Sequence, residues 1–168
     1  NVDSHESLPI VEASLDDLVN DFAPFRRCNY LPLAMTGHLM FNAIDAENVS
    51  TQSAKLIEKV IRGHIGFDGL LMTDDISMKA LSPDIGITLH AENALRAGCD
   101  VILHCNGDAS EMFPLMETLP RLNGRALERA DKAMKLLTSN TTKIDAATAE
   151  EEWKELISAH FPESPKNV

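Results

Sequence analysis

The chain has 168 residues, of which 44% are hydrophobic and 24% are charged, which is typical of one globular domain with a buried core. Its formal net charge of −11 argues against a nucleic acid or an anionic membrane as partner, because both attract clustered Lys and Arg. No apolar run approaches the ~18 residues of a membrane-spanning helix. The three cysteines lack metal or disulfide spacing and indicate reduced thiols, so we expect a cytoplasmic protein.

The amino-terminal segment is polar and contains the stretch Asp3-Ser4-His5. A helix is predicted after it, with Ser14 as its N-cap and Pro24 as its end. A short apolar strand follows at 31–35 and runs into Thr36-Gly37-His38. Because the first residue is Asn rather than Met, we expect a fragment or a cleaved product.

The middle of the chain repeats this order of helix and strand. Ser50 or Thr51 is expected to cap a second helix, which Gly63 ends. An apolar strand at 70–72 then runs into Thr73-Asp74-Asp75. The two adjacent carboxylates at this point are the most informative feature of the sequence, because acidic groups beside a core are costly unless they have a task.

A third unit and three further helices complete the chain. A helix is predicted at 87–97, stopped by Gly98, and a strand at 101–103 that runs into His104-Cys105-Asn106. A short helix at 108–117 should end before Pro120. Two amphipathic helices, joined by a polar linker at 138–145, are expected to cover the outside of the sheet, and the tail at 162–168 is expected to fray.

The spacing of about 30 residues per unit predicts an α/β fold with a parallel sheet and right-handed crossovers. Each of the three strands is followed by polar residues. Both open doubly-wound sheets and (β/α)8 barrels place their functional groups at the carboxyl ends of the strands. The pattern therefore predicts which end of the sheet is functional and leaves closure of the sheet open.

The carboxylates of Asp74 and Asp75 have more than one interpretation. An Asp after a strand is often the N-cap of the next helix, but neighbouring side chains point in different directions, so one cap cannot account for both. A Mg²⁺ site would need further oxygen ligands that the sequence does not indicate. We expect one carboxylate to bind locally and the other to face the centre of the rim.

Histidines near the strand ends offer proton-transfer groups. A His beside a carboxylate in a polar loop, as in Asp3-Ser4-His5, is usually a surface feature, but the carboxylate can also tune the imidazole for proton transfer near neutral pH. His38 and His104 each follow a strand. For both, contact with a ligand and a satisfied structural role are equally open.

Several stretches together resemble bacterial β-N-acetylhexosaminidases of glycoside hydrolase family 3, the cytoplasmic peptidoglycan-recycling type. The principal ones are VDSH at 2–5 and GFDGLLMTDDISMKAL at 66–81, with support from AMTGH at 34–38 and AGCDVILHCN at 97–106. The resemblance extends from residue 2 to about residue 129. An Asp rather than a Trp after the nucleophile position and the Asp-x-His loop are typical of the hexosaminidase branch.

The resemblance implies a retaining glycoside hydrolase that removes terminal β-linked N-acetylglucosamine, as in anhydromuropeptides. Asp74 would be the nucleophile that forms a covalent glycosyl-enzyme. His5 would be the acid/base, oriented by Asp3, and His38 and Asn106 would bind the substrate. No metal or organic cofactor is implied.

The resemblance also implies the carboxyl-terminal part of a TIM barrel, because a full (β/α)8 barrel takes about 250 residues. We expect a partial barrel domain at 1–122, whose strands correspond to the sixth to eighth, and packing helices at 123–168. Such a fragment would self-associate or need the amino-terminal half. Two alternatives are a catalytically inactive truncated barrel that binds a carbohydrate or another partner, and a phosphate-binding barrel, for which 106–108 is a poor phosphate loop.

Overall fold

The computed structural model describes residues 3, 5–139 and 145–160. These divide into two compact units, residues 1–135 and residues 136–168. The division lies within the first of the two carboxyl-terminal helices, whereas the sequence suggested a boundary at 122. Part of the polar linker expected at 138–145, and the tail at 162–168, lie outside the described residues.

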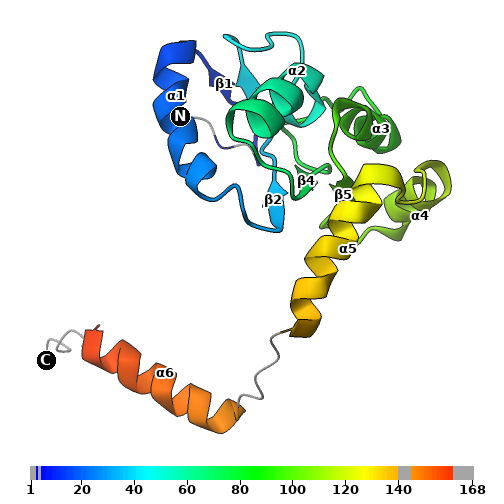
Figure 1. Ribbon diagram of the computed structural model, residues 1–168. Helices are drawn as coiled ribbons and strands as arrows, with labels where there is room; N and C mark the ends of the chain where they lie inside the picture. Colours follow the sequence, from blue (N-terminus) through cyan, green and yellow to red (C-terminus); the bar gives the residue numbers. More distant parts are fainter. Residues whose placement is uncertain (1–2, 4, 140–144, 161–168) are drawn as a thin grey trace, which may run out of the picture. The chain divides into compact units, whose positions relative to one another are not determined.

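A three-stranded parallel sheet organises the first unit, as predicted (Figure 1). Its strands are β2 (Leu33–Met35), β4 (Leu70–Asp75) and β5 (Val101–Leu103), in the spatial order β2-β4-β5. The sheet is open in the described residues, with β2 and β5 at its edges, so the α/β fold is confirmed and barrel closure is not seen. β4 is the central strand and carries its polar residues at its carboxyl end.

A second, smaller parallel sheet was not expected. It pairs β1 (Ile10–Val11) with β3 (Met40–Phe41). Each strand has only two residues, which is too short for an alternating pattern to be recognised. This sheet ties the amino-terminal segment to the chain that follows β2.

The helix α1 (Leu15–Arg27) begins as predicted but does not end at Pro24. The Ser14 hydroxyl accepts a hydrogen bond from the amide of Asp17 at 3.3 Å. The expected end at Pro24 is wrong, since the helix continues to Arg27. Proline removes one backbone donor, but its fixed φ is compatible with helical geometry, and the Cys28 amide closes the last turn on the carbonyl of Phe25 at 3.0 Å.

The second helix begins later than predicted. A 3-10 turn, η1 (Ser50–Gln52), precedes α2 (Ala54–Leu56), which continues into the π-helix η2 (Ile57–His64). The cap is Ser53, whose hydroxyl accepts from the amide of Leu56 at 3.1 Å. Neither of the two residues expected as the cap takes this role, because both of their hydroxyls donate to the carbonyl of Gly37 in the loop that follows β2.

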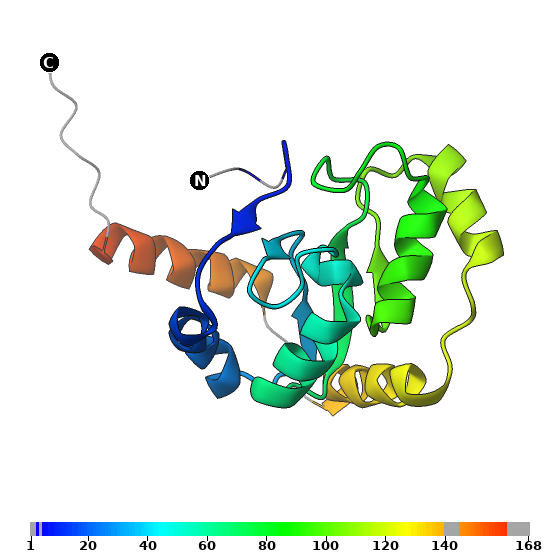
Figure 2. The same cartoon turned by 90° about the horizontal axis from the view of Figure 1, so that it is seen from above.

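The predictions for the third unit are confirmed. The helix α3 (Ile87–Ala97) ends at Gly98, which adopts φ +115°, a left-handed conformation that glycine takes at low cost. The helix α4 (Ala109–Thr118) begins at the cap Asp108. Figure 2 shows α3 and α4 running side by side.

Two clusters of apolar side chains form the core of the first unit. The larger one joins η2 and α3 to the sheet, through Ile57, Leu71 and Ala94. The smaller one lies beneath the segment after β4, where Ile76 and Leu81 pack with residues of α3 and α4. Because Ile76 directly follows the two carboxylates, this second cluster anchors the functional end of β4.

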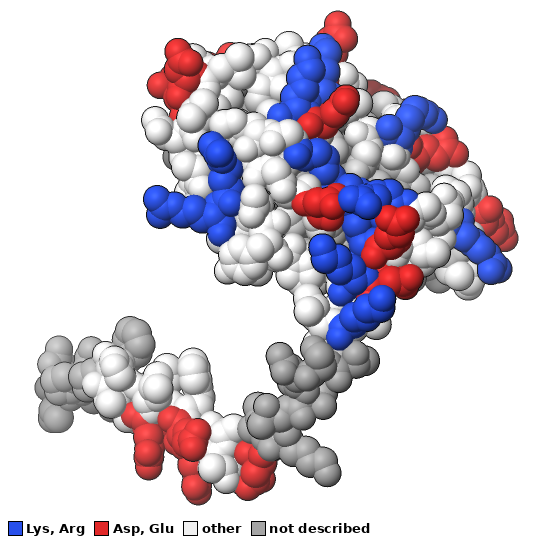
Figure 3. Space-filling model, viewed as in Figure 1, with Lys and Arg blue, Asp and Glu red and all other residues white. Residues whose placement is uncertain are grey.

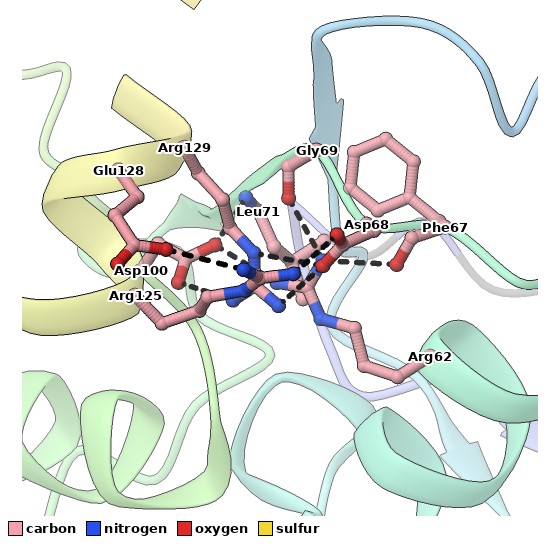
Figure 4. Close-up of polar contacts among 9 residues, drawn as sticks. All are labelled: Arg62, Phe67, Asp68, Gly69, Leu71, Asp100, Arg125, Glu128 and Arg129. Atoms are coloured by element: carbon pink, nitrogen blue, oxygen red, sulfur yellow. Dashed lines mark hydrogen bonds and ion pairs between the residues drawn. The ribbon is translucent and has the colours of Figure 1, made fainter. Parts of the chain in front are cut away.

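The carboxyl-terminal helices are α5 (Gly124–Ser139) and α6 (Ala146–His160). The sequence predicted that both cover the sheet. The first part of α5 belongs to the first unit, where the ion pairs drawn in Figure 4 join it to Asp68 and Asp100. None of the described α6 residues is buried. Figure 3 shows Lys and Arg interleaved with Asp and Glu over the face that α5 occupies. No helix among the described residues is long and apolar enough to cross a membrane.

Candidate active site

The carboxyl end of β4 presents two adjacent carboxylates with different surroundings. Asp74 Oδ1 accepts a hydrogen bond from the backbone amide of Asp75 at 2.9 Å, and both side chains are partly exposed. Among the described residues, this neighbouring amide is the one hydrogen-bond donor to the Asp74 carboxylate. The Oδ2 atom of Asp74 is therefore open to a ligand.

The carboxylate of Asp75 is taken up by local contacts. It accepts hydrogen bonds from the Ser77 amide at 3.0 Å, from the Ser77 hydroxyl at 2.8 Å and from the Cys105 amide at 3.2 Å. Burial alone would raise the pKa of Asp75, but these donors and the nearby His104 outweigh it, so the pKa lies below its ordinary value. Asp75 therefore joins the loop after β5 to the end of β4.

Asp3 and His5 form a hydrogen-bonded pair in the exposed amino-terminal loop. His5 Nδ1 lies 2.8 Å from Asp3 Oδ1, and the same oxygen accepts from the His5 amide at 2.9 Å. The hydrogen bond that His5 donates to Asp3 raises the pKa of His5, and the charges of Asp3, Asp74 and Asp75 add to the increase. The backbone and side-chain hydrogen bonds from His5 lower the pKa of Asp3. The charges at the end of β4 thus act on the His5 imidazole.

His38 supports the end of β4 from below. It is 0% exposed, with Nε2 at 2.9 Å from the carbonyl oxygen of Asp75 and Nδ1 at 2.9 Å from the Thr51 hydroxyl. Burial lowers the pKa of His38, so the ring is neutral. Because a carbonyl can only accept, Nε2 carries the proton, and Nδ1 lies within hydrogen-bond distance of the Thr51 hydroxyl. His38 therefore presents no free ring nitrogen to a substrate in this structure.

Asn106 and His104 lie in the loop after β5 and share one carboxylate. Glu111 Oε2 accepts from His104 Nε2 at 2.8 Å and from Asn106 Nδ2 at 2.9 Å. The Asn106 carbonyl oxygen accepts from the amide of Asp108 at 2.8 Å. The side chain of Asn106 is exposed but both of its polar atoms already have protein partners.

Sequence reasoning did not single out Thr51 or Glu111. Glu111 stands three residues after the cap Asp108, which is the spacing of a capping box, and this local role gives no sign of a contact with the loop after β5. Thr51 was considered only as a helix cap. In both cases the functional signal is a contact with a distant strand end, which local sequence patterns do not report.

A metal site is not evident in the described residues, where no group of three or more His, Cys, Asp or Glu side chains could hold an ion. The arrangement instead offers one carboxylate with an open oxygen and an imidazole tuned by a second carboxylate. Those groups are suited to nucleophilic attack and to proton transfer.

A family model for the glycosyl hydrolase family 3 N terminal domain matches residues 1–149. The chain belongs to this family. The resemblance inferred from the sequence is thereby confirmed. The Beta-hexosaminidase of Tolumonas auensis is 29% identical over 156 residues, which cover 90% of this chain and 44% of that protein. The Beta-hexosaminidase of Bordetella avium is 33% identical over 107 residues, covering 62% of this chain and 30% of the relative.

Solved structures agree with the family assignment. NagZ from Neisseria gonorrhoeae, in complex with N-trifluoroacetyl-D-glucosamine, has a TM-score of 0.66 at 26% identity and covers 83% of this chain and 43% of its own. A family 3 β-N-acetylglucosaminidase from Paenibacillus sp. str. FPU-7 also has a TM-score of 0.66, at 27% identity. The match covers 86% of this chain and 31% of the Paenibacillus chain. The chain spans less than half the length of these relatives.

Proposed function

We propose that this family 3 chain supplies the nucleophile and the proton-transfer pair of a retaining β-N-acetylhexosaminidase. The single observation that carries the proposal is the Asp3–His5 pair, whose imidazole has its pKa raised by Asp3 and also by Asp74. An acid/base and a nucleophile that act on one bond must share one electrostatic environment. The names of the curated relatives support the same activity.

The reaction would proceed in two steps. The Asp74 carboxylate attacks the anomeric carbon, the bond to the leaving oxygen breaks, and His5 gives its proton to that oxygen. Water then attacks the same carbon while His5 takes a proton from it, and the ester to Asp74 breaks. Asp3 orients His5 and stabilises its charged form, and Asp75 holds the neighbouring loop.

The substrate class follows from the same relatives. A terminal β-linked N-acetylglucosamine is proposed, released from anhydromuropeptides during peptidoglycan recycling in the cytoplasm. The sugar derivative named with the Neisseria structure is an N-acylated glucosamine, which supports this class. The exposed amide side chain of Asn106 lies on the rim where such a sugar would be bound, and His38 would act through the end of β4.

The test is hydrolysis of a chromogenic N-acetyl-β-glucosaminide by the chain and by Asp74→Asn. We expect turnover that disappears in the variant, because the amide cannot form the covalent intermediate. Asp3→Ala should move the alkaline limb of the pH profile to lower pH, because the hydrogen bond that most raises the pKa of His5 is lost. Turnover that persists in Asp74→Asn would contradict the proposal.

A second candidate is a non-catalytic module that binds a carbohydrate or another partner, or a second copy of the chain. The observation that favours it is the edge strand β2, where Leu33 and Met35 are exposed beside an apolar cavity of about 250 Å³. An open edge can pair with another strand. Sedimentation at several concentrations, together with the hydrolysis assay, separates an associating module without turnover from an enzyme.

A further inference from the structure

The loop between β5 and α4 is held from two sides. On one side, the Cys105 amide donates to the Asp75 carboxylate at 3.2 Å. On the other side, Glu111 of α4 accepts from both His104 and Asn106 through a single oxygen, at 2.8 and 2.9 Å. A continuous series of hydrogen bonds therefore connects α4 to the end of β4.

Glu111 is not needed for capping its own helix. Asp108 already caps α4, since its carboxylate accepts from the Ser110 amide at 2.8 Å. Hydrogen bonds from Asn106 and from His104 lower the pKa of Glu111, so its carboxylate is ionised. An ionised carboxylate is a stronger hydrogen-bond acceptor than a neutral one. Its contacts point to the loop rather than to the helix backbone.

His104 depends on this contact more than Asn106 does. Its side chain is 7% exposed, and its buried Nδ1 has no hydrogen-bond partner among the residues that the structure describes. A carboxylate can only accept, so the Nε2 that faces Glu111 carries a proton. Without Glu111 both ring nitrogens would lack a protein partner, which a nearly buried ring does not tolerate at low cost.

We propose that Glu111 is a positioning residue that holds the loop at 104–106 against Asp75 and thereby orients the carboxyl end of β4. This inference deepens the proposed function, because the residue next to Asp75 is the proposed nucleophile Asp74. Glu111 acts through the loop and touches no reacting atom. The fixed loop keeps the Cys105 amide on one oxygen of Asp75, which leaves the Asp75 backbone amide directed at Asp74.

Amide hydrogen exchange tests the proposal without requiring turnover. Glu111→Ala removes both contacts, and we expect the exchange of the Cys105 amide to accelerate at least tenfold, because the loop loses the charged acceptor that holds it. Glu111→Gln keeps an acceptor oxygen and should retain most of the protection. Glu117→Ala is the matched control, because Glu117 is exposed on the same helix.

The titration of Asp75 distinguishes positioning from a simple charge effect. If Glu111 positions the loop, Glu111→Ala raises the pKa of Asp75, because the Cys105 donor is lost. If Glu111 acted only as a nearby negative charge, its removal would lower that pKa instead. In Glu111→Gln, where the loop stays in place, we expect no rise.

Three results would overturn the inference. The first is unchanged Cys105 exchange in folded Glu111→Ala, and the second is the same acceleration in Glu117→Ala. The third is a fall in the pKa of Asp75 in Glu111→Ala. Failure of the wild-type chain to hydrolyse the chromogenic substrate is a separate result, which would count against the proposed function and not against the positioning of the loop.

Discussion

Asp100 stands at the amino end of β5 and connects three elements of the first unit (Figure 4). Its Oδ2 accepts from the Leu71 amide and from Arg62 Nη2, both at 2.8 Å, and its Oδ1 accepts from Arg129 Nη1 at 2.9 Å. It is only 8% exposed. We predict that Asp100→Ala is among the most destabilising single changes in this chain.

The magnitude follows from what the substitution leaves behind. The buried Leu71 amide would lose its acceptor, which costs about 1–3 kcal/mol, and two largely buried guanidinium groups would lose a counter-charge. Breaking a buried pair in this way costs about 3–5 kcal/mol. That is a large part of the about 5–15 kcal/mol that holds a typical domain folded.

Asp68 provides a matched control within the same cluster. It pairs with Arg125 at 2.6 Å and with Arg129 at 2.8 Å, but its side chain is 55% exposed. Exposed pairs contribute about 0–1 kcal/mol because water and salt screen them. Asp68→Ala should therefore cost much less than Asp100→Ala, although both residues contact the same arginine.

Urea unfolding followed by far-ultraviolet circular dichroism measures the two free energies. The single tryptophan, Trp153, lies on α6 in the second unit, so its fluorescence would not report on this cluster. Comparison is valid if the dependence on urea concentration is the same for both variants. Equal losses for Asp68→Ala and Asp100→Ala would refute the reasoning, which rests on the difference in burial.

Three further predictions concern other positions in the first unit. Burial lowers the pKa of His38 from its ordinary 6.5, so the unfolded chain takes up a proton that the folded chain does not. The free energy of unfolding should therefore fall as the pH drops below 6.5. This dependence on pH should be weaker in His38→Gln. Gly98→Ala should cost about 1–3 kcal/mol, measured by urea unfolding, because φ is +115° and the new Cβ would lie 3.0 Å from Ile57 Cγ2; an unchanged midpoint would contradict this. Burial raises the pKa of Cys99 to about 12, so mass spectrometry should find Cys99 unalkylated in the folded chain, whereas the exposed cysteines react.

Local signals were enough to predict several elements. Gly98 ends α3, and Asp108 caps α4, because a left-handed glycine and an N-cap act on the nearest turn of backbone. The same kind of reasoning went wrong at Pro24 and for the cap of the second helix. At Pro24 the φ of proline is compatible with the helix that continues past it, and at the second helix the hydroxyls of Ser50 and Thr51 bind the distant Gly37 carbonyl instead of a helix amide.

The sequence by itself determined the family, the order of the helices and of the three strands of the main sheet, and which end of that sheet carries the acidic pair. These follow from motif spacing and from the period of apolar residues. The tertiary structure decided what each polar group does: Asp75 ties down a loop, His38 is buried beneath the strand end, and Glu111 reaches back from α4. Such roles arise from contacts between residues far apart in the chain, and their energies depend on burial, which exists only once the sheet and helices have packed.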